Sequence, residues 1–210
     1  MHVQGVPKAL VTGLACFATL CSVATAGPDS VIPASGPVPP PIEVSAIVEA
    51  PVEEVWKAWT TSEGIPTFMG FGAEVDARPR GVFRVIFNVD KSALLDRGND
   101  GIIVAIEPMS MLSVLWMTPM NMPNLRGNST SLMIYFQKID DGKRTLVRIV
   151  NAGYGLGPDW AAAYQYNVRG WDRVLQGLQY RFKTGPIDWK WAMEEFRKTG
   201  AFPWWRKKAP

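Results

Sequence analysis

The chain has 210 residues, of which 47% are hydrophobic and 20% are charged, and its formal net charge is only +3. This length and composition fit one domain with short tails, and they supply enough apolar side chains for a substantial core. The small, dispersed positive charge argues against nucleic acid as the main partner.

The first residues have the pattern of a cleavable export signal. Residues 1–8 carry positive charge, and residues 9–20 are mostly apolar but short for a bilayer-spanning helix. Small residues at 24–26 then fit a signal-peptidase site, so we expect a signal peptide over residues 1–26, cleaved after Ala26. The sequence therefore predicts an exported protein, periplasmic or secreted. A retained membrane anchor is the competing interpretation.

Cleavage at that site would change the chemistry open to the mature chain. Cys16, Cys21 and His2 are the chain's only cysteines and histidine, and all of them precede the cleavage site. The mature chain would then have no thiol nucleophile, no Ser-His-Asp triad and no zinc or haem site built on His or Cys. We therefore expect no metal and no cofactor.

The folded domain is expected to start at Ile42. Residues 27–41 are rich in Pro, Gly and Ser and predict an extended spacer. Residues 42–49 alternate between apolar and polar side chains, which is typical of a half-buried strand. Pro51 suits the first position of a helix, and a second short helix, irregular at its proline, is expected over residues 62–69.

The middle of the chain is rich in strands. Strand-length apolar segments cover residues 81–88, 101–107, 111–117, 129–138 and 143–151. The Asp141-Gly142 pair between the last two is a strong hairpin signal. Short turns between successive strands predict an antiparallel meander.

A long amphipathic helix is predicted from Pro158 to about Lys183. Its apolar stripe has helical spacing and consists of Trp160, Tyr164, Val168, Trp171, Leu175, Leu178 and Phe182. Gly185 and Pro186 end this helix, and Asp188 suits the cap of a final short one. A curved sheet cannot bury its concave face alone, so the long helix must cover it. The space between them is either solid core or a ligand cavity.

Four segments, in order along the chain, resemble a known superfamily: EAPVEEVWKAWTTSEGIPTFMG, ARPRGVFRVIF, GIIVAIEPMSMLSVLW and AAAYQYNVRGWDRVLQGLQ. Together they are similar to START-like SRPBCC proteins, in the branch of the activator of heat-shock-protein ATPase homologues. The resemblance implies an α+β helix-grip fold, in which a curved antiparallel sheet wraps around a long C-terminal helix, with two short helices after the first strand. It assigns residues 42–186 to this domain and leaves residues 187–210 as a Trp-rich extension.

The helix and the inner strand faces supply the candidate ligand-binding residues. These are Phe83, Val85, Phe87, Val114, Trp116, Trp160, Tyr164, Val168 and Trp171. Plain core packing is the alternative for such aromatic residues. Arg84 and Arg148 would be polar anchors if they pointed inward, although strand alternation favours solvent exposure. No spacing forces two carboxylates together, so no catalytic residue is predicted.

The resemblance and the apolar residues favour a non-enzymatic protein that binds a small apolar or amphipathic molecule in the cavity. One alternative is a cofactor-independent cyclase or dehydratase acting on a hydrophobic substrate. Another is a protein-interaction module like the heat-shock-protein ATPase activators. The Trp204-Trp205 pair and the basic residues 206–208 could touch a membrane surface, but docking on the domain or disorder is favoured.

Overall fold

The computed structural model describes residues 36–87, 99–118 and 122–205. The predicted signal peptide, the first part of the spacer and the basic residues 206–208 lie outside these ranges. Within the described ranges, no helix combines the length and the apolar character that crossing a bilayer requires.

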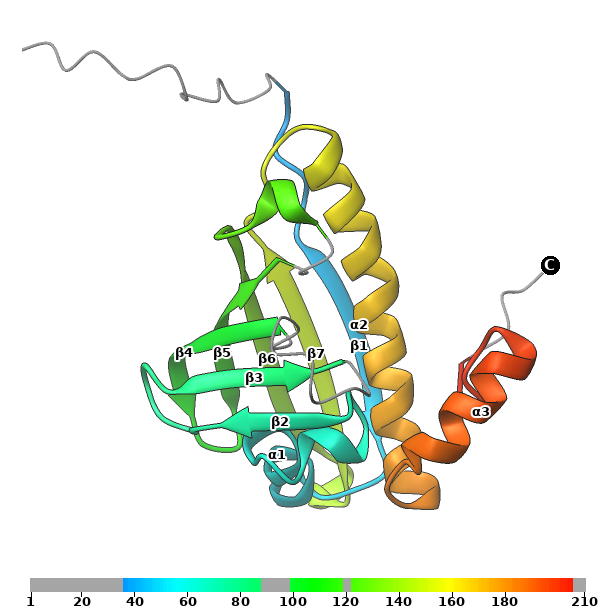
Figure 1. Cartoon of the computed structure of the whole chain (residues 1–210). Helices are drawn as coiled ribbons and strands as arrows, with labels where there is room; N and C mark the ends of the chain where they lie inside the picture. Colours follow the sequence, from blue (N-terminus) through cyan, green and yellow to red (C-terminus); the bar gives the residue numbers. More distant parts are fainter. Residues whose placement is uncertain (1–35, 88–98, 119–121, 206–210) are drawn as a thin grey trace, which may run out of the picture. The chain divides into compact units, whose positions relative to one another are not determined.

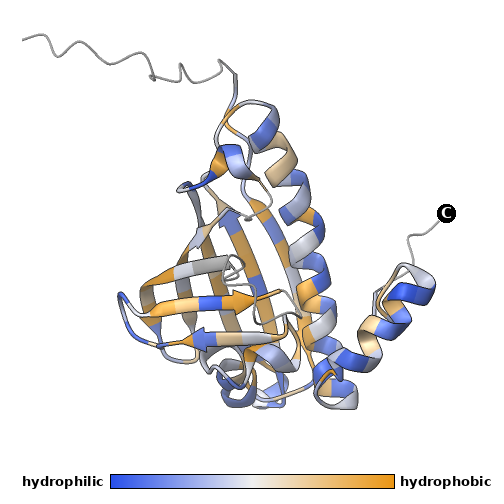
Figure 2. Ribbon diagram, in the orientation of Figure 1, coloured by the Kyte–Doolittle hydropathy of each residue, from blue (hydrophilic) through white to orange (hydrophobic). Residues whose placement is uncertain are grey.

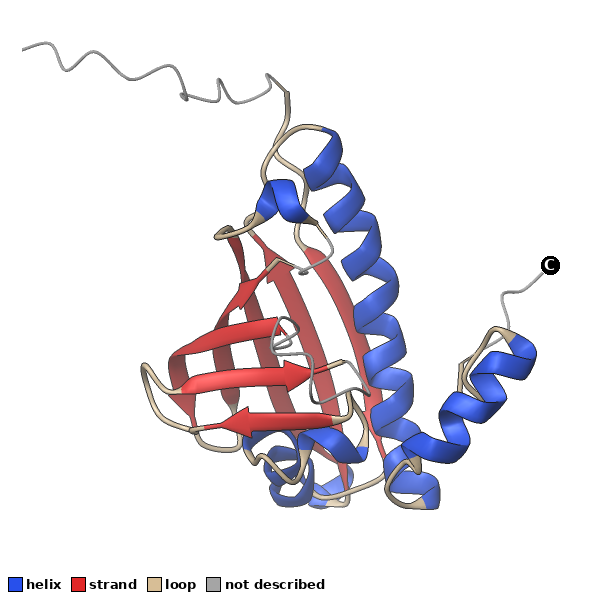
Figure 3. Ribbon diagram, viewed as in Figure 1, coloured by secondary structure: helices blue, strands red, loops and turns tan. Residues whose placement is uncertain are grey.

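A curled antiparallel sheet forms the body of the domain (Figures 1 and 3). Its strand order is β1-β7-β6-β5-β4-β3-β2, so β2 to β7 form a meander and β1 joins beside β7. This is the predicted meander, extended by one strand. The strands are β1 Ile42–Val48, β2 Gly72–Val75, β3 Val82–Ile86, β4 Asn99–Glu107, β5 Met111–Met117, β6 Ser129–Ile139 and β7 Arg144–Ala152.

Local sequence explains most strand boundaries. Asp141 and Gly142 adopt left-handed backbone angles, with φ of 53° and 83°, and turn β6 into β7 as the Asp-Gly pair predicts. Strand β2 was not predicted, because its sequence GAEV has weak intrinsic preference for strands. Its pairing with β3 supplies the missing stabilisation, with Gly72 opposite Ile86 and Val75 opposite Phe83.

The helices are α1 Val52–Thr60, η1 Ile65–Thr67, η2 Pro123–Leu125, η3 Asp140–Gly142, α2 Pro158–Thr184 and α3 Trp189–Thr199. The predicted helix over residues 62–69 was too long: only the single turn η1 forms, around Pro66, which lacks a backbone N–H. Helix α2 begins at Pro158 and ends at Thr184, just before Gly185, as expected. Asp188 caps α3, since its carboxylate accepts hydrogen bonds from the backbone N–H groups of Lys190 and Trp191 at 2.9 and 3.1 Å.

The core lies between the concave face of the sheet and the helices α1 and α2. Trp59 from α1, Phe83 from β3 and Leu178 from α2 are fully buried there. Figure 2 shows hydrophobic residues concentrated along the strands, while hydrophilic residues are spread over α3. The predicted helix-grip architecture is confirmed.

One glycine lets α2 approach the chain after η1. A Cβ atom at position 177 would lie 2.6 Å from the backbone oxygen of Phe68, so any larger residue would push the two segments apart. This close contact holds the start of the segment 68–71 against the C-terminal half of α2. The same residues form one side of the pocket described next.

Candidate functional site

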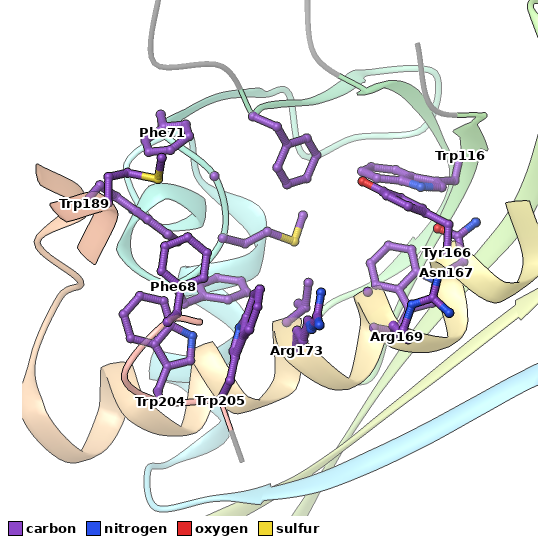
Figure 4. Close-up of a pocket in the computed structure, with 18 residues that line it drawn as sticks. Phe68, Phe71, Trp116, Tyr166, Asn167, Arg169, Arg173, Trp189, Trp204 and Trp205 are labelled. Atoms are coloured by element: carbon purple, nitrogen blue, oxygen red, sulfur yellow. The ribbon is translucent and has the colours of Figure 1, made fainter. Parts of the chain in front are cut away.

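A partly open pocket of about 650 Å³ lies between α2, the chain after η1 and the C-terminal extension (Figure 4). Phe87, which follows β3, and Trp116, near the end of β5, complete its walls. The lining residues are mostly aromatic or Met: Phe68, Met69, Gly70, Phe71, Phe87, Trp116, Tyr166, Asn167, Arg169, Gly170, Trp171, Arg173, Val174, Trp189, Met193, Phe202, Trp204 and Trp205. The site is therefore an apolar pocket with few polar groups.

Hydrogen bonds fix the orientation of Trp171, which separates the pocket from the core. Its indole N–H donates to Oδ1 of buried Asn151 on β7 at 2.9 Å. The amide of Asn151 in turn donates to Oγ1 of Thr130 at 2.8 Å and to the backbone oxygen of Ser131 at 3.0 Å. On its other side, the Trp171 ring lies 5.4 Å from that of Trp116. This pocket wall is thus held rigidly by the sheet.

Tyr154 belongs to the same buried polar network. Its hydroxyl donates to Oδ1 of Asn151, beside the bond from Trp171. Burial raises the pKa of Tyr154, and a hydrogen bond with Asn167 opposes only part of that rise. The hydroxyl therefore stays protonated at neutral pH and acts as a permanent donor.

The C-terminal extension supplies a wall of the pocket. Trp189 on α3 donates its indole N–H to the backbone oxygen of Pro66 at 2.5 Å. The Trp204 ring packs 5.1 Å from Tyr180 of α2, and Phe202 stacks on Trp204 with 2° between the ring planes. Through residue 205 the extension therefore docks on the domain, one of the two arrangements favoured from the sequence.

Arg169 and Arg173 are the charged residues of the lining. The Arg173 guanidinium lies 3.7 Å from the ring centre of Trp205, in a cation–π contact. No ion pair found among residues 36–87, 99–118 and 122–205 includes either arginine. The pocket is therefore electropositive along one edge.

The predicted ligand-binding residues divide into three groups. Phe87, Trp116 and Trp171 line the pocket. Phe83, Val85 and Val114 face inward as expected but are fully buried in the core. Trp160, Tyr164 and Val168 on α2 pack against the core and do not reach the pocket. The reason is Tyr154, whose ring fills the space beneath this part of the helix, 6.2 Å from Trp160 and 5.0 Å from Tyr164.

Neither predicted polar anchor reaches the pocket. Strand alternation turns Arg84 away from its buried neighbours Phe83 and Val85, and its side chain pairs with Glu74. Arg148 is likewise turned outward, with its guanidinium 3.6 Å from the Glu43 carboxylate. The hypothesis of inward-pointing arginines on the strands is therefore wrong for this pocket.

Sequence reasoning missed the arginines of α2 and the residues contributed by the extension. Arg169 and Arg173 are four residues apart and so share one face of α2, but each lies two residues from Trp171, a spacing that does not place them on the apolar stripe. No pattern in the sequence therefore signalled that they line the pocket. For a cofactor or metal, the described residues offer no group of three or more His, Cys, Asp or Glu side chains able to hold an ion. Of the lining residues that the structure describes, none carries a carboxylate, thiol or imidazole.

Solved structures with low sequence identity share this fold. A Mesorhizobium loti protein is 19% identical with a TM-score of 0.55, over 70% of this chain and 100% of that one. The Aha1 dimer from Colwellia psychrerythraea is 17% identical with a TM-score of 0.53, over 70% of this chain and 98% of that one. The crystal structure of CalU16 from Micromonospora echinospora is 19% identical with a TM-score of 0.51, over 76% of this chain and 84% of that one.

A comparison with curated protein sequences finds no match. Family assignment therefore depends on the sequence pattern shared by the family as a whole. The model of the family described as activator of Hsp90 ATPase homolog 1-like protein matches residues 49–183, from the end of β1 almost to the end of α2. The chain therefore belongs to the activator of Hsp90 ATPase homolog 1-like family.

Proposed function

We propose that this protein binds a small apolar or amphipathic molecule in the pocket between α2 and its C-terminal extension. The observation that carries the proposal is the pocket of about 650 Å³, walled by aromatic and Met side chains from several elements. Ligand sites for small organic molecules typically have volumes of about 300–1,000 Å³ and mostly apolar walls. The START-like fold also supports a ligand-binding or polyketide-cyclase-like domain.

The lining favours binding over catalysis. A cyclase or dehydratase must move protons, and this task usually falls to His, Asp, Glu or a tuned Lys or Tyr. Among the lining residues within the described ranges, only Tyr166 is of such a type, and it is 42% exposed. A purely binding role needs no such group, so the enzymatic alternative has weaker support.

Two tryptophans of the extension, Trp189 and Trp204, offer little to a protein partner, whereas Trp191 is 39% exposed. Trp189 is hydrogen-bonded to the backbone at Pro66, and Trp204 is packed between Tyr180 and Phe202. Side chains that already have partners on their own domain do not form a free contact surface. This observation favours small-molecule binding over a protein-interaction module.

Gly170 offers a direct test of the pocket. A Cβ atom there would meet no atom within 4 Å, and the residue belongs to the lining near the middle of α2. Gly170→Phe should therefore fill the pocket without straining the helix. The probe is the neutral dye N-phenyl-1-naphthylamine, whose fluorescence rises on entering an apolar site.

We expect the wild-type chain to bind this dye with saturation, and Gly170→Phe to weaken binding about tenfold or more, the cost of losing about 1.4 kcal/mol of contact. Ala162→Phe, at an exposed position of the same helix outside the lining, is the matched control and should bind like the wild type. Equal dye binding by all these proteins would reject the pocket as the binding site.

We also propose that the protein works outside the cytoplasm, on the strength of the signal-peptide pattern in residues 1–26. Expression of the full chain in a bacterial host, followed by N-terminal sequencing of the periplasmic fraction, tests this. Mature protein starting at Gly27 is the expected result. An intact chain confined to the cytoplasm would contradict export and would leave the binding proposal unaffected.

A further inference from the structure

We infer that the ligand is an amphipathic anion whose single negatively charged group is bound by Arg169 and Arg173 at the edge of the pocket. This inference builds on the proposed binding function and specifies the chemical class of its ligand. A carboxylate, sulfonate or sulfate attached to an apolar body has this chemistry.

Position is the first argument. The two arginines are four residues apart on α2, so their side chains leave the same face of the helix one turn apart. Both line the pocket, and Figure 4 shows them between Trp205 at one end and Tyr166 at the other. Two guanidinium groups so placed can bind one anion together.

Charge balance is the second argument. Every arginine within a strand has a carboxylate partner: Arg84 pairs with Glu74, Arg144 with Glu49 and Asp140, and Arg148 with Glu43. In the described part of the chain, Arg169 and Arg173 form no such pair, and the pocket lining contains no Asp or Glu. Like charges one turn apart on a helix repel each other. A bound anion would remove this repulsion.

The contact with Trp205 prepares Arg173 for this role. A guanidinium stacked on a ring uses its flat face and leaves its N–H groups free in its own plane. Those N–H groups match the two oxygens of a carboxylate or sulfonate. Trp205 is itself packed 4.9 Å from Phe202 and 5.8 Å from Phe196, so the extension holds the arginine in place.

The walls of the pocket away from the arginines determine the chemistry of the uncharged part of the ligand. Apart from the arginines, Asn167 and Tyr166, its walls are apolar and consist mainly of Phe68, Met69, Phe71, Trp171, Trp189 and Trp204. Arg169 and Arg173 are exposed, so an anion bound to them stays partly hydrated and escapes the full cost of burial. One charged end and one apolar body are therefore the combination that fits.

Two dyes with the same aromatic skeleton test this inference. 8-Anilinonaphthalene-1-sulfonate carries a sulfonate that neutral N-phenyl-1-naphthylamine lacks. We expect the wild-type chain to bind the sulfonate about tenfold more tightly, since a hydrogen bond to a charged group contributes at least that factor. Arg169→Gln and Arg173→Gln should each lose most of this preference, measured as the ratio of the affinities for the two dyes.

Arg197→Gln is the matched control, since it removes an exposed arginine on α3 that does not line the pocket. It should keep the preference. Arg173→Lys retains the positive charge but lacks the planar guanidinium, so it should keep part of the preference for the sulfonate dye. Far-ultraviolet circular dichroism checks that each variant is folded.

Equal affinity for the two dyes, or a preference that survives in both glutamine variants, would overturn the anion site and leave the pocket proposal standing. Failure of the wild type to bind either dye would overturn both.

Discussion

The two halves of α2 present similar aromatic stripes to very different surroundings. In the first half, Trp160 and Tyr164 pack against the ring of Tyr154. In the second half, Trp171 forms a wall of an open pocket. The helix is continuous, so what differs is the structure that faces it: a tyrosine fills the space at one end, while the chain after η1 and the docked extension enclose it at the other. An aromatic stripe alone does not distinguish core from binding site.

The largest expected effect comes from Trp171, which belongs to both the core and the pocket. Trp171→Ala removes an indole that is only 3% exposed and leaves Oδ1 of Asn151 with one donor fewer. We expect the free energy of unfolding to fall by about 3–5 kcal/mol, as for other buried aromatic truncations. Urea denaturation measures it. A loss below about 1 kcal/mol would show that this residue is not part of the core.

A smaller loss should follow from Asn151→Ala. The change removes the acceptor shared by Trp171 and Tyr154 and leaves those buried donors unsatisfied. The expected cost is about 1–3 kcal/mol in the free energy of unfolding. The neutral dye should also bind more weakly, because the Trp171 ring loses its anchor. Unchanged stability together with unchanged dye affinity would mean that the network does not position this wall.

A pair of tryptophan variants compares the two halves directly. Trp160→Ala removes packing against Tyr154 and should cost about 1–3 kcal/mol of stability while leaving dye affinity unchanged. Trp204→Ala removes a pocket wall and should weaken dye binding severalfold, while the free energy of unfolding falls by only about 1 kcal/mol. The reverse outcome, with binding lost in Trp160→Ala and kept in Trp204→Ala, would place the site at the front of α2.

The smallest effect concerns the hydroxyl of Tyr154. Its pKa in the folded chain is raised above the ordinary value near 10, so the stability it contributes is complete below that pH and is lost as pH rises further. Tyr154→Phe should cost about 1 kcal/mol at pH 7, where a hydrogen bond is lost. Above pH 10 the variant should lose stability less steeply than the wild type. Parallel curves of unfolding free energy against pH would contradict this role.

Local patterns were enough to predict most of the fold. Alternation in the first strand and strand-length apolar segments with short turns in the others located six of the seven strands. A proline, a glycine and a capping aspartate marked the bounds of α2 and the start of α3. Strand β2 was not predicted, because its pairing with β3, and not its own sequence, stabilises it. These successes share one cause, since each element is set by residues that are close together in sequence.

The pocket was predicted less well, because its walls depend on contacts between distant segments. Trp189 meets Pro66 across more than a hundred residues, and no local spacing signals that contact. Tyr154 is only six and ten residues from Trp160 and Tyr164, but its place beneath them depends on the turn that leads β7 into α2, which no residue pattern specified. Sequence identified an aromatic stripe, and tertiary packing decided which part of it borders the pocket.

A crystal structure of the full chain with 8-anilinonaphthalene-1-sulfonate tests the central claim most directly. The account predicts the aromatic rings of the dye between α2 and the side chains of Trp116, Trp189 and Trp204, with the sulfonate within hydrogen-bonding distance of Arg169 and Arg173. A dye bound only at another surface, with this pocket left without it at saturating concentration, would contradict the account.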